Sequence, residues 1–231
     1  MRTFCFIFAR GGSKGIINKN IQKIGKYSLV EHSILMAKSI NRHIDEIFIS
    51  SDSKDILTIA DKYKVNKIIR PNSLSKDISS EWLAWQHAVK IAYKEYGKFN
   101  TFLSLPATAP LRSKSDILKC LTLFNKKKSQ TVITYKQAHS NPWFNMILRN
   151  KKSHLSLVNG NKKKIFRRQQ APIVYDMTTV AYVSSPDFIL NNHSIWDGTV
   201  DGVLIPKERA IDIDDSLDLL VAKNLYKNVK K

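Results

Sequence analysis

A short apolar strand that runs directly into a glycine-rich, basic loop is the feature that most constrains this chain. Residues 3–8 read TFCFIF, and residues 9–20 read ARGGSKGIINKN. Glycines let the backbone approach a ligand closely and direct N–H groups toward it. Arg10 and Lys14 add positive charge, which makes the loop a candidate polyphosphate site. It is neither a Walker A loop nor a GxGxxG dinucleotide loop, and the alternative is a β-turn followed by a solvated basic segment.

Strand-like and helix-like segments alternate along the chain. Apolar runs predict strands over 3–8, 46–50, 67–70, 101–105, 131–135, 173–183 and 202–206. Apolar residues at helical spacing predict helices that follow Ser28, cover 55–63, include 82–96 and 117–124, and cover 216–229. Ser28 with Glu31, and Ser113 with Asp116, have the spacing of helix-capping pairs. This alternation predicts an α/β fold with a doubly wound, mostly parallel sheet.

The segment 136–170 departs from this pattern. It is polar and rich in Lys and Asn, with apolar side chains at Trp143, Phe144 and 146–148. A segment of this texture does not continue a buried core. We therefore expect one domain over residues 1–231, with an inserted hairpin element over 136–170.

The strong positive charge raises the alternative of a nucleic-acid-binding protein. The chain has 38 Lys and Arg against 19 Asp and Glu, a formal net charge of +19. These lysines are scattered, however, and no RNP motif, Cys/His finger or helix-turn-helix signature accompanies them. Solubility, compositional bias and attraction of anionic small substrates explain the excess at least as well.

Other features favour a cytoplasmic protein without a membrane span. No apolar run approaches the length of a transmembrane helix. The N-terminal apolar stretch is short and leads into a polar loop, unlike a signal peptide. Cys5 and Cys120 have no partner at metal-binding spacing and are expected to be reduced core residues.

In a doubly wound sheet, ligands bind at the carboxyl ends of the strands. Those ends lead into the glycine-rich loop, into 50–52, into Arg70 and into 106–112. Arg10, Lys14 and Arg70, with Arg112 as a further candidate, would then surround one crevice suited to a nucleoside triphosphate. The alternative for Arg112 is that it caps a helix or pairs with Asp116.

Triphosphate chemistry normally uses a divalent ion, and the segment 210–215, AIDIDD, offers carboxylates for it. In an extended stretch Asp212 and Asp214 point the same way, because the side-chain period is two. Two carboxylates on one side predict a Mg²⁺ site. The alternative is a turn in which Asp214 or Asp215 caps the last helix. The two interpretations are compatible if Asp215 is the cap while Asp212 and Asp214 hold the metal.

Paired arginines at 167–168 form a third candidate site. Such a pair suits recognition of a carboxylate or phosphate. In a chain this basic, a plain surface patch is an equally good interpretation.

Taken together, these motifs resemble the CMP-sugar cytidylyltransferases of the CMP-N-acetylneuraminate synthetase type. The matching pieces occur in the family's order and cover nearly the whole chain: ARGGSKG at 9–15 with Lys19 and Asn20, SSDS at 50–53, Arg70-Pro71 with Asp77, ATAPLR at 107–112, Arg168-Gln169 with Pro172 and Tyr175, and IDID at 211–214 followed by Leu217-Asp218. The glycine-rich opening and the IDID ending are together quite specific. The resemblance implies a Rossmann-like nucleotidyltransferase fold.

The resemblance also implies a reaction and a set of nucleotide contacts. Such enzymes join CTP to a 2-keto-3-deoxy sugar acid and release pyrophosphate. The loop residues Arg10, Gly11, Gly12, Ser13 and Lys14 would hold the phosphates, Asn20 and Arg70 would contact the nucleoside, and the 77–81 loop, with Asp77 and Ser80, would close over the cytosine. Asp212 and Asp214 would bind Mg²⁺. Arg10, Lys14 and Asp212 would be the catalytic residues, and the base remains open between a metal-bound hydroxide and an Asp of this cluster.

For the sugar acid, the resemblance places Thr108, Arg168, Gln169 and Tyr175 beside the substrate. A carboxylate on the sugar would pair with Arg168. The family is usually dimeric, with a protruding subdomain that reaches over the neighbouring active site, and the segment 136–170 matches that element. The implied partners are therefore CTP, a sugar acid and a second copy of the chain.

Departures from the family pattern leave the sugar open. Pro106 stands where sialate enzymes carry Gln, and 178–180 reads TTV where they read Asn-Gly-Ala. A legionaminate-type or other nonulosonate is thus at least as good a candidate as N-acetylneuraminate, with an octulosonate as the alternative. A sugar 1-phosphate nucleotidyltransferase is a further rival, although the loop lacks its usual Gly-x-Gly-x-Arg pattern. A non-catalytic nucleic-acid-binding protein is the most distant one.

Overall fold

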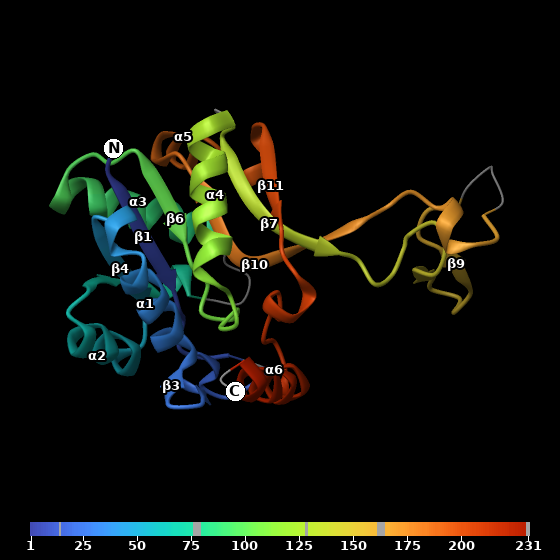
Figure 1. Ribbon diagram of the computed structural model, residues 1–231, viewed down its shortest axis with the longest axis horizontal. Coiled ribbons are helices and arrows are strands. Elements are labelled where there is room, and N and C mark those ends of the chain that lie inside the picture. The colour runs from blue at the N-terminus through green and yellow to red at the C-terminus, as the bar shows by residue number, and fades with distance from the viewer. Residues whose placement is uncertain (14, 76–79, 128, 161–164, 230–231) are drawn as a thin grey trace.

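The computed structural model describes residues 1–13, 15–75, 80–127, 129–160 and 165–229, and its centre is a seven-stranded sheet (Figure 1). The strands are β1 (Thr3–Phe8), β4 (Glu46–Ser51), β5 (Asn66–Ile69), β6 (Thr101–Ser104), β7 (Thr131–Gln137), β10 (Tyr175–Ser184) and β11 (Val200–Leu204). Their order across the sheet is β11-β7-β10-β6-β1-β4-β5. All pairs are parallel except those of β10, which runs antiparallel to β6 and β7.

The mostly parallel sheet is the predicted one, and the antiparallel strand has a simple cause. After β7 the chain makes a long excursion and comes back as β10, which pairs with β7. Two strands joined in this hairpin manner pair antiparallel, whereas a parallel neighbour needs a crossover connection.

Helices cover both faces of the sheet. They are α1 (Leu29–Ser39), α2 (Lys54–Tyr63) and α4 (Lys114–Lys127) on one face, and α3 (Glu81–Tyr96) and α5 (Pro186–Asn191) on the other. Phe4 and Phe6 of β1 pack toward α3 and α5, while Cys5 and Ile7 pack toward α1, α2 and α4. Successive side chains of a strand alternate between faces, so a strand that is apolar on both must be covered on both. The doubly wound α/β class is therefore confirmed.

The predicted helix caps are present. The Glu31 N–H donates to Ser28 Oγ (3.4 Å) and the Ser28 N–H to Glu31 Oε2 (2.8 Å). Ser113 and Asp116 form the same reciprocal pair at the start of α4. The short helix α5 was not predicted, because six residues are too few for a helical period to show.

The last helix, α6 (Ser216–Val229), brings the C-terminal segment against the start of the chain. Ile213 and Leu219 pack with Ile24 of the short strand β2 (Lys23–Ile24), next to β3 (Tyr27–Ser28), and with Leu29. Figure 1 shows α6 beside β3, well away from the amino end of β1. This packing carries the aspartate segment toward the glycine-rich loop.

The excursion between β7 and β10 lies apart from the sheet. Its strands β8 (Ile147–Arg149) and β9 (Leu155–Leu157) form a separate antiparallel pair, to the right in Figure 1. Ile147, Leu148 and Leu155 are each more than half exposed there. The β8–β9 pair lies within residues 136–170, where an inserted hairpin was expected. That this segment is an inserted dimerisation element stays a prediction.

The prediction for the two cysteines is met. Cys5 and Cys120 are buried free thiols, and burial raises the pKa of Cys120 to about 12. No helix in the described ranges is long and apolar enough to cross a membrane.

Candidate functional site

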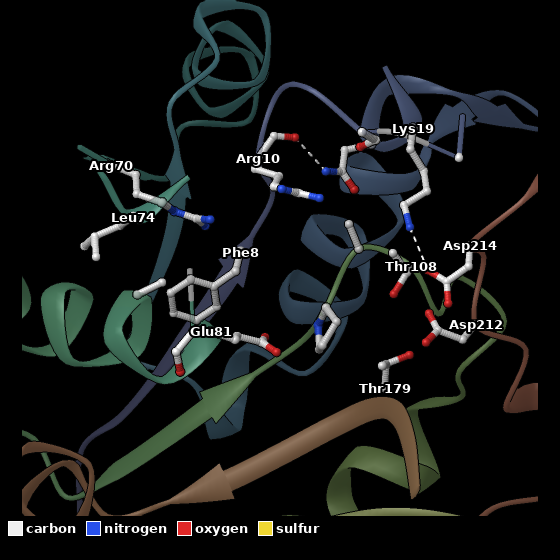
Figure 2. A pocket seen from close by; sticks show the side chains of 17 residues that line it. Phe8, Arg10, Lys19, Arg70, Leu74, Glu81, Thr108, Thr179, Asp212 and Asp214 are labelled. Atoms are coloured by element: carbon white, nitrogen blue, oxygen red, sulfur yellow. Dashed lines mark hydrogen bonds and ion pairs between the residues drawn. The ribbon is translucent and has the colours of Figure 1, made fainter. Parts of the chain in front are cut away.

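A cavity of about 540 Å³ lies where the carboxyl ends of β1 and β6 meet the C-terminal segment. Figure 2 shows its 17 lining residues, with side chains from both ends of the chain turned toward the same space. They are Phe8, Arg10, Ser13, Gly15, Lys19, Asn20, Arg70, Leu74, Ser80, Glu81, Ala84, Pro106, Ala107, Thr108, Thr179, Asp212 and Asp214. The cavity is thus at the strand edge where a doubly wound sheet binds ligands.

The glycine-rich loop is held in place by its neighbours. The Gly11 N–H donates to Asp52 Oδ1 (2.9 Å), just beyond the end of β4. Buried Asn20 donates from Nδ2 to the Arg10 carbonyl (2.9 Å). Gly12 has nothing within 4 Å of where a Cβ would stand, so this part of the loop is open. Asn20 therefore orients the turn that carries Arg10, and Lys14, the next predicted cation, lies outside the described residues.

The loop and the aspartate segment touch at Gly15. A Cβ on this residue would lie closer than 3.0 Å to the Asp214 carbonyl oxygen, so the close approach of the two backbones requires glycine. Nearby, Lys19 Nζ pairs with Asp214 Oδ1 at 2.9 Å. The Ile213 N–H donates to the Thr108 carbonyl (2.9 Å), which ties the segment to the loop after β6. The two predicted motifs thus share one cavity.

Asp212 and Asp214 differ in environment. Asp214 is exposed and paired with Lys19, whereas Asp212 is largely enclosed. Burial raises the pKa of Asp212, and the Asp214 carboxylate adds to this, while the Thr108 and Thr179 hydroxyls and Lys19 oppose it. Asp212 Oδ1 is buried without a hydrogen-bond partner among the described residues. A buried carboxylate oxygen of this kind is costly unless something binds it.

This orphaned oxygen, next to a second carboxylate, fits a hard divalent cation such as Mg²⁺. No group of three or more His, Cys, Asp or Glu side chains suited to a metal occurs in the described part of the chain. Mg²⁺ is commonly bound by one or two carboxylates, with waters and substrate phosphates completing its shell. The donor set at Asp212 and Asp214 matches that pattern.

The opposite end of the cavity holds Arg70. Its Nη2 donates to the Ser50 carbonyl (2.7 Å) and its Nε to Ser50 Oγ (3.2 Å), and its guanidinium lies 5.6 Å from the centre of the Phe8 ring. Burial lowers its pKa and Arg10 lowers it further, while Asp52 and Glu81 oppose this. Ser80 also lines this end and caps α3 through the Trp82 N–H (3.2 Å), whereas Asp77 lies outside the described residues.

Arg112 is not part of the cavity, so the prediction that it faces the crevice is wrong. It is buried and donates to the carbonyls of Ala109 (2.8 Å) and Pro106. Its expected alternative partner, Asp116, instead forms a two-pronged ion pair with Arg209 at 2.9 Å. Arg112 therefore braces the turn after β6 that presents Thr108, because its five donors can satisfy several carbonyls at once.

Three residues predicted beside the sugar lie elsewhere in this chain. Arg168 and Gln169 line a separate cavity at the base of the hairpin, where Arg168 Nη1 donates to the His139 carbonyl (2.6 Å). The exposed Tyr175 packs its ring against Tyr135 (5.0 Å between centroids). Of the predicted sugar contacts, only Thr108 lines the main cavity, and the roles of the other three stay predictions.

The structure adds cavity residues to which no role was assigned from the sequence. Lys19 follows the glycine-rich loop, but nothing in the sequence indicates that it reaches Asp214, which is 195 positions away. Phe8 is the last residue of a predicted core strand and gave no signal of a ligand contact. Thr179 lies on β10, whose unpredicted direction brings its hydroxyl to Asp212.

Comparisons with known proteins agree with this geometry. The family described as "Cytidylyltransferase" matches residues 4–195. "Post-translational flagellin modification protein B" of Campylobacter coli is 34% identical over 226 residues, covering 96% of this chain and 94% of that protein. "CMP-N,N'-diacetyllegionaminic acid synthase" of Campylobacter jejuni is 33% identical over 225 residues, covering 96% and 93%. A structure of CMP:2-keto-3-deoxy-manno-octonic acid synthetase complexed with CTP shares the fold, with a TM-score of 0.71 at 12% identity over 99% of this chain and 100% of that one. The chain therefore belongs to the cytidylyltransferase family.

Proposed function

We propose that this protein transfers CMP from CTP to the anomeric hydroxyl of a nonulosonic acid, a nine-carbon 2-keto-3-deoxy sugar acid of the legionaminic or sialic type, and releases pyrophosphate. The observation that carries the proposal is the meeting of the glycine-rich loop and the paired aspartates in one cavity, in contact at Gly15. The similarity to a relative named as a CMP-legionaminic acid derivative synthase favours a nonulosonate.

In the proposed reaction, the anomeric oxygen attacks the α-phosphorus and gives its proton to an aspartate carboxylate of the 212–214 segment or to water. The bond between the α-phosphorus and the bridging oxygen breaks, and pyrophosphate leaves from the opposite side. The protein mainly positions the two substrates and neutralises charge. Arg10 and the open backbone around Gly12 hold the β- and γ-phosphates, with Lys14 as a further cation. Because these contacts strengthen as charge builds on the departing pyrophosphate, they favour the transition state over the bound substrate.

We propose that Asp212 and Asp214 hold Mg²⁺ when the nucleotide binds. The ion would supply polarisation of the phosphoryl oxygens and shielding of their negative charge. Lys19 pairs with Asp214 in the structure, and its positive charge offsets the repulsion between the two carboxylates. Thr108 and Thr179 line the cavity beside Asp212, and their hydroxyls favour the ionised form of its carboxyl group.

We also propose that the protein is a homodimer joined through the β8–β9 hairpin. The hairpin exposes the apolar side chains of Ile147, Leu148 and Leu155. Exposed apolar patches mark sites of interaction with other proteins. In such a dimer, Arg168 of one subunit would approach the cavity of the other. Sedimentation at micromolar concentration tests this: Ile147→Asp is expected to convert a dimer to a monomer, and a wild-type protein that sediments as a monomer would refute the proposal.

A pyrophosphate-release assay tests the main proposal. CTP, UTP, GTP and ATP are each combined with a panel of nonulosonic acids and an eight-carbon octulosonic acid in the presence of Mg²⁺. We expect release with CTP and a nonulosonic acid. A preference for UTP or GTP, or activity confined to the octulosonic acid, would overturn the proposed reaction.

A further inference from the structure

The cavity has two chemically different ends. Arg10, Lys19 and the aspartate pair line one end. The other end combines the apolar walls of Phe8, Leu74 and Ala84 with the two charged side chains of Arg70 and Glu81. Figure 2 shows Phe8, Leu74, Arg70 and Glu81 grouped on one side of the cavity, with Lys19, Thr108, Asp212 and Asp214 on the other. If phosphates occupy the first end, as the proposed function requires, the flat, weakly polar nucleobase occupies the end that contains Glu81.

Glu81 is held in a defined position at this end. It is the first residue of α3, and Trp85 Nε1, one turn later, donates to its Oε1 at 3.3 Å. Trp85 is itself 3% exposed and packs against Phe102 and Tyr182, with ring centroids 5.1 and 5.4 Å away. The indole therefore cannot easily move, and it fixes the direction of the carboxylate.

The second carboxylate oxygen of Glu81 is left to accept a further hydrogen bond. Among the described residues, Trp85 is the side chain that donates to this carboxylate. Arg70, the nearby cation, donates hydrogen bonds from Nε and Nη2 to Ser50 and forms no ion pair with Glu81. Glu81 is an exposed residue that lines the cavity. Desolvation by the surrounding protein and the Asp212 carboxylate raise its pKa, while Trp85 and Arg70 oppose the shift. A donor that reached Oε2 would relieve this cost.

Cytosine and uracil differ where such a donor matters. Cytosine carries an exocyclic amino group at C4, a donor, whereas uracil carries a carbonyl oxygen, an acceptor. An ionised carboxylate only accepts hydrogen bonds, and Glu or Asp paired with the cytosine amino group is an established mode of base recognition. Uracil would place two acceptors face to face in a partly desolvated cavity.

We infer that Glu81 selects the base of the nucleotide: its Trp85-anchored carboxylate accepts a hydrogen bond from the 4-amino group of cytosine and rejects the 4-carbonyl of uracil. This assignment rests on the proposed function, since it takes CTP to be the nucleotide. Glu81 is thus a specificity-determining residue, and it takes no part in the phosphoryl transfer.

The test compares ligands and variants in pairs. Binding of CTP, UTP and the triphosphate of 2-pyrimidinone riboside, which lacks the 4-amino group, is measured by calorimetry with Mg²⁺ for wild type, Glu81→Gln and Glu81→Ala. Glu95→Gln, an exposed change near the other end of α3, is the matched control. For wild type and the control, loss of the amino group is expected to weaken binding by about 10- to 100-fold, the range of one good base contact.

In Glu81→Ala, replacing CTP by the analogue without the 4-amino group is expected to weaken binding by less than about threefold, because the carboxylate that accepts from the amino group is gone. In Glu81→Gln the CTP/UTP ratio is expected to fall by about tenfold or more, since an amide N–H can donate to the uracil carbonyl. A wild-type protein that prefers CTP while both variants keep that preference would overturn the role of Glu81 and leave the proposed function standing.

A wild-type protein with no preference for CTP over UTP would instead refute the proposed function together with this inference. If both variants fail to fold, the affinities of the wild-type protein for the three nucleotides still test the inference. Equal affinity for CTP and for the analogue without the 4-amino group refutes it.

Discussion

Replacing Gly15 by alanine tests the contact between the glycine-rich loop and the aspartate segment. The new Cβ would stand closer than 3.0 Å to the Asp214 carbonyl oxygen and 3.5 Å from its carbonyl carbon, and both are backbone atoms that cannot rotate away. An ordinary contact needs roughly 1 Å more separation, and a misplacement of that size between reacting groups can cost about 100-fold in rate. We expect kcat/KM for CTP to fall by that order.

Stability should fall as well, but less. Overpacking lowers the free energy of unfolding by about 1–3 kcal/mol. Alanine has a smaller conformational entropy than glycine in the unfolded chain, and this raises the free energy of unfolding by about 0.4–1 kcal/mol. The net loss of about 1–2 kcal/mol corresponds to a lower Tm of about 2–8 °C for a chain of this size.

Two glycines with open surroundings serve as controls, measured by calorimetry and by the pyrophosphate-release assay. Gly160 lies in the hairpin region, and a Cβ there meets nothing within 4 Å. Gly160→Ala should keep both activity and Tm, and Gly12→Ala, also with open space around its Cβ, should keep Tm. Wild-type activity and Tm in Gly15→Ala would mean that the two segments do not meet as described.

Three further predictions concern charge. Burial raises the pKa of Glu31, but hydrogen bonds from Lys62, Ser28 and Tyr63 outweigh it and bring the value to about 2. The resulting stabilisation is present above the unfolded pKa of about 4.3 and is lost as pH falls toward 2. In urea titrations, Glu31→Gln should therefore lower the free energy of unfolding at pH 7 and match wild type near pH 2. A difference in unfolding free energy between the two proteins that stays the same at both pH values would contradict this. Lys14→Ala should slow turnover of CTP by about 100-fold, and unchanged kinetics would remove its phosphate role. Arg168→Ala should raise the KM for the sugar acid by about tenfold or more, and an effect confined to CTP would move Arg168 to the nucleotide.

Local signals made most of the fold predictable. The apolar run Thr3–Phe8 is β1, and the Ser28–Glu31 capping box begins α1. Trp82 and Trp85, in the helix predicted to include 82–96, pack in the core. The direction of β10 was not predictable, because it depends on how the hairpin folds back and not on the composition of Tyr175–Ser184 itself.

The candidate site was predictable where residues lie on strand ends or share a local period. Arg10 follows the strand predicted over 3–8, and Arg70 ends the strand predicted over 67–70. Asp212 and Asp214 have the alternation that brings them to one side. Contacts between distant segments were not predictable, as Lys19 with Asp214 shows. The placement of Arg112 at the crevice was wrong for a related reason. Its residue type suggested a phosphate ligand, but its guanidinium donates to buried carbonyls in the turn after β6.

The central claim is that the glycine-rich loop and the aspartate pair bind the same Mg²⁺–nucleotide complex. Calorimetric affinity for CTP, with and without Mg²⁺, tests it most directly in wild type, Asp212→Asn and Arg10→Ala. We expect Mg²⁺ to tighten CTP binding to wild type, Asp212→Asn to abolish that tightening, and Arg10→Ala to weaken binding under both conditions. If Asp212→Asn responds to Mg²⁺ as wild type does, the aspartate pair does not hold the nucleotide's metal and the claim is wrong.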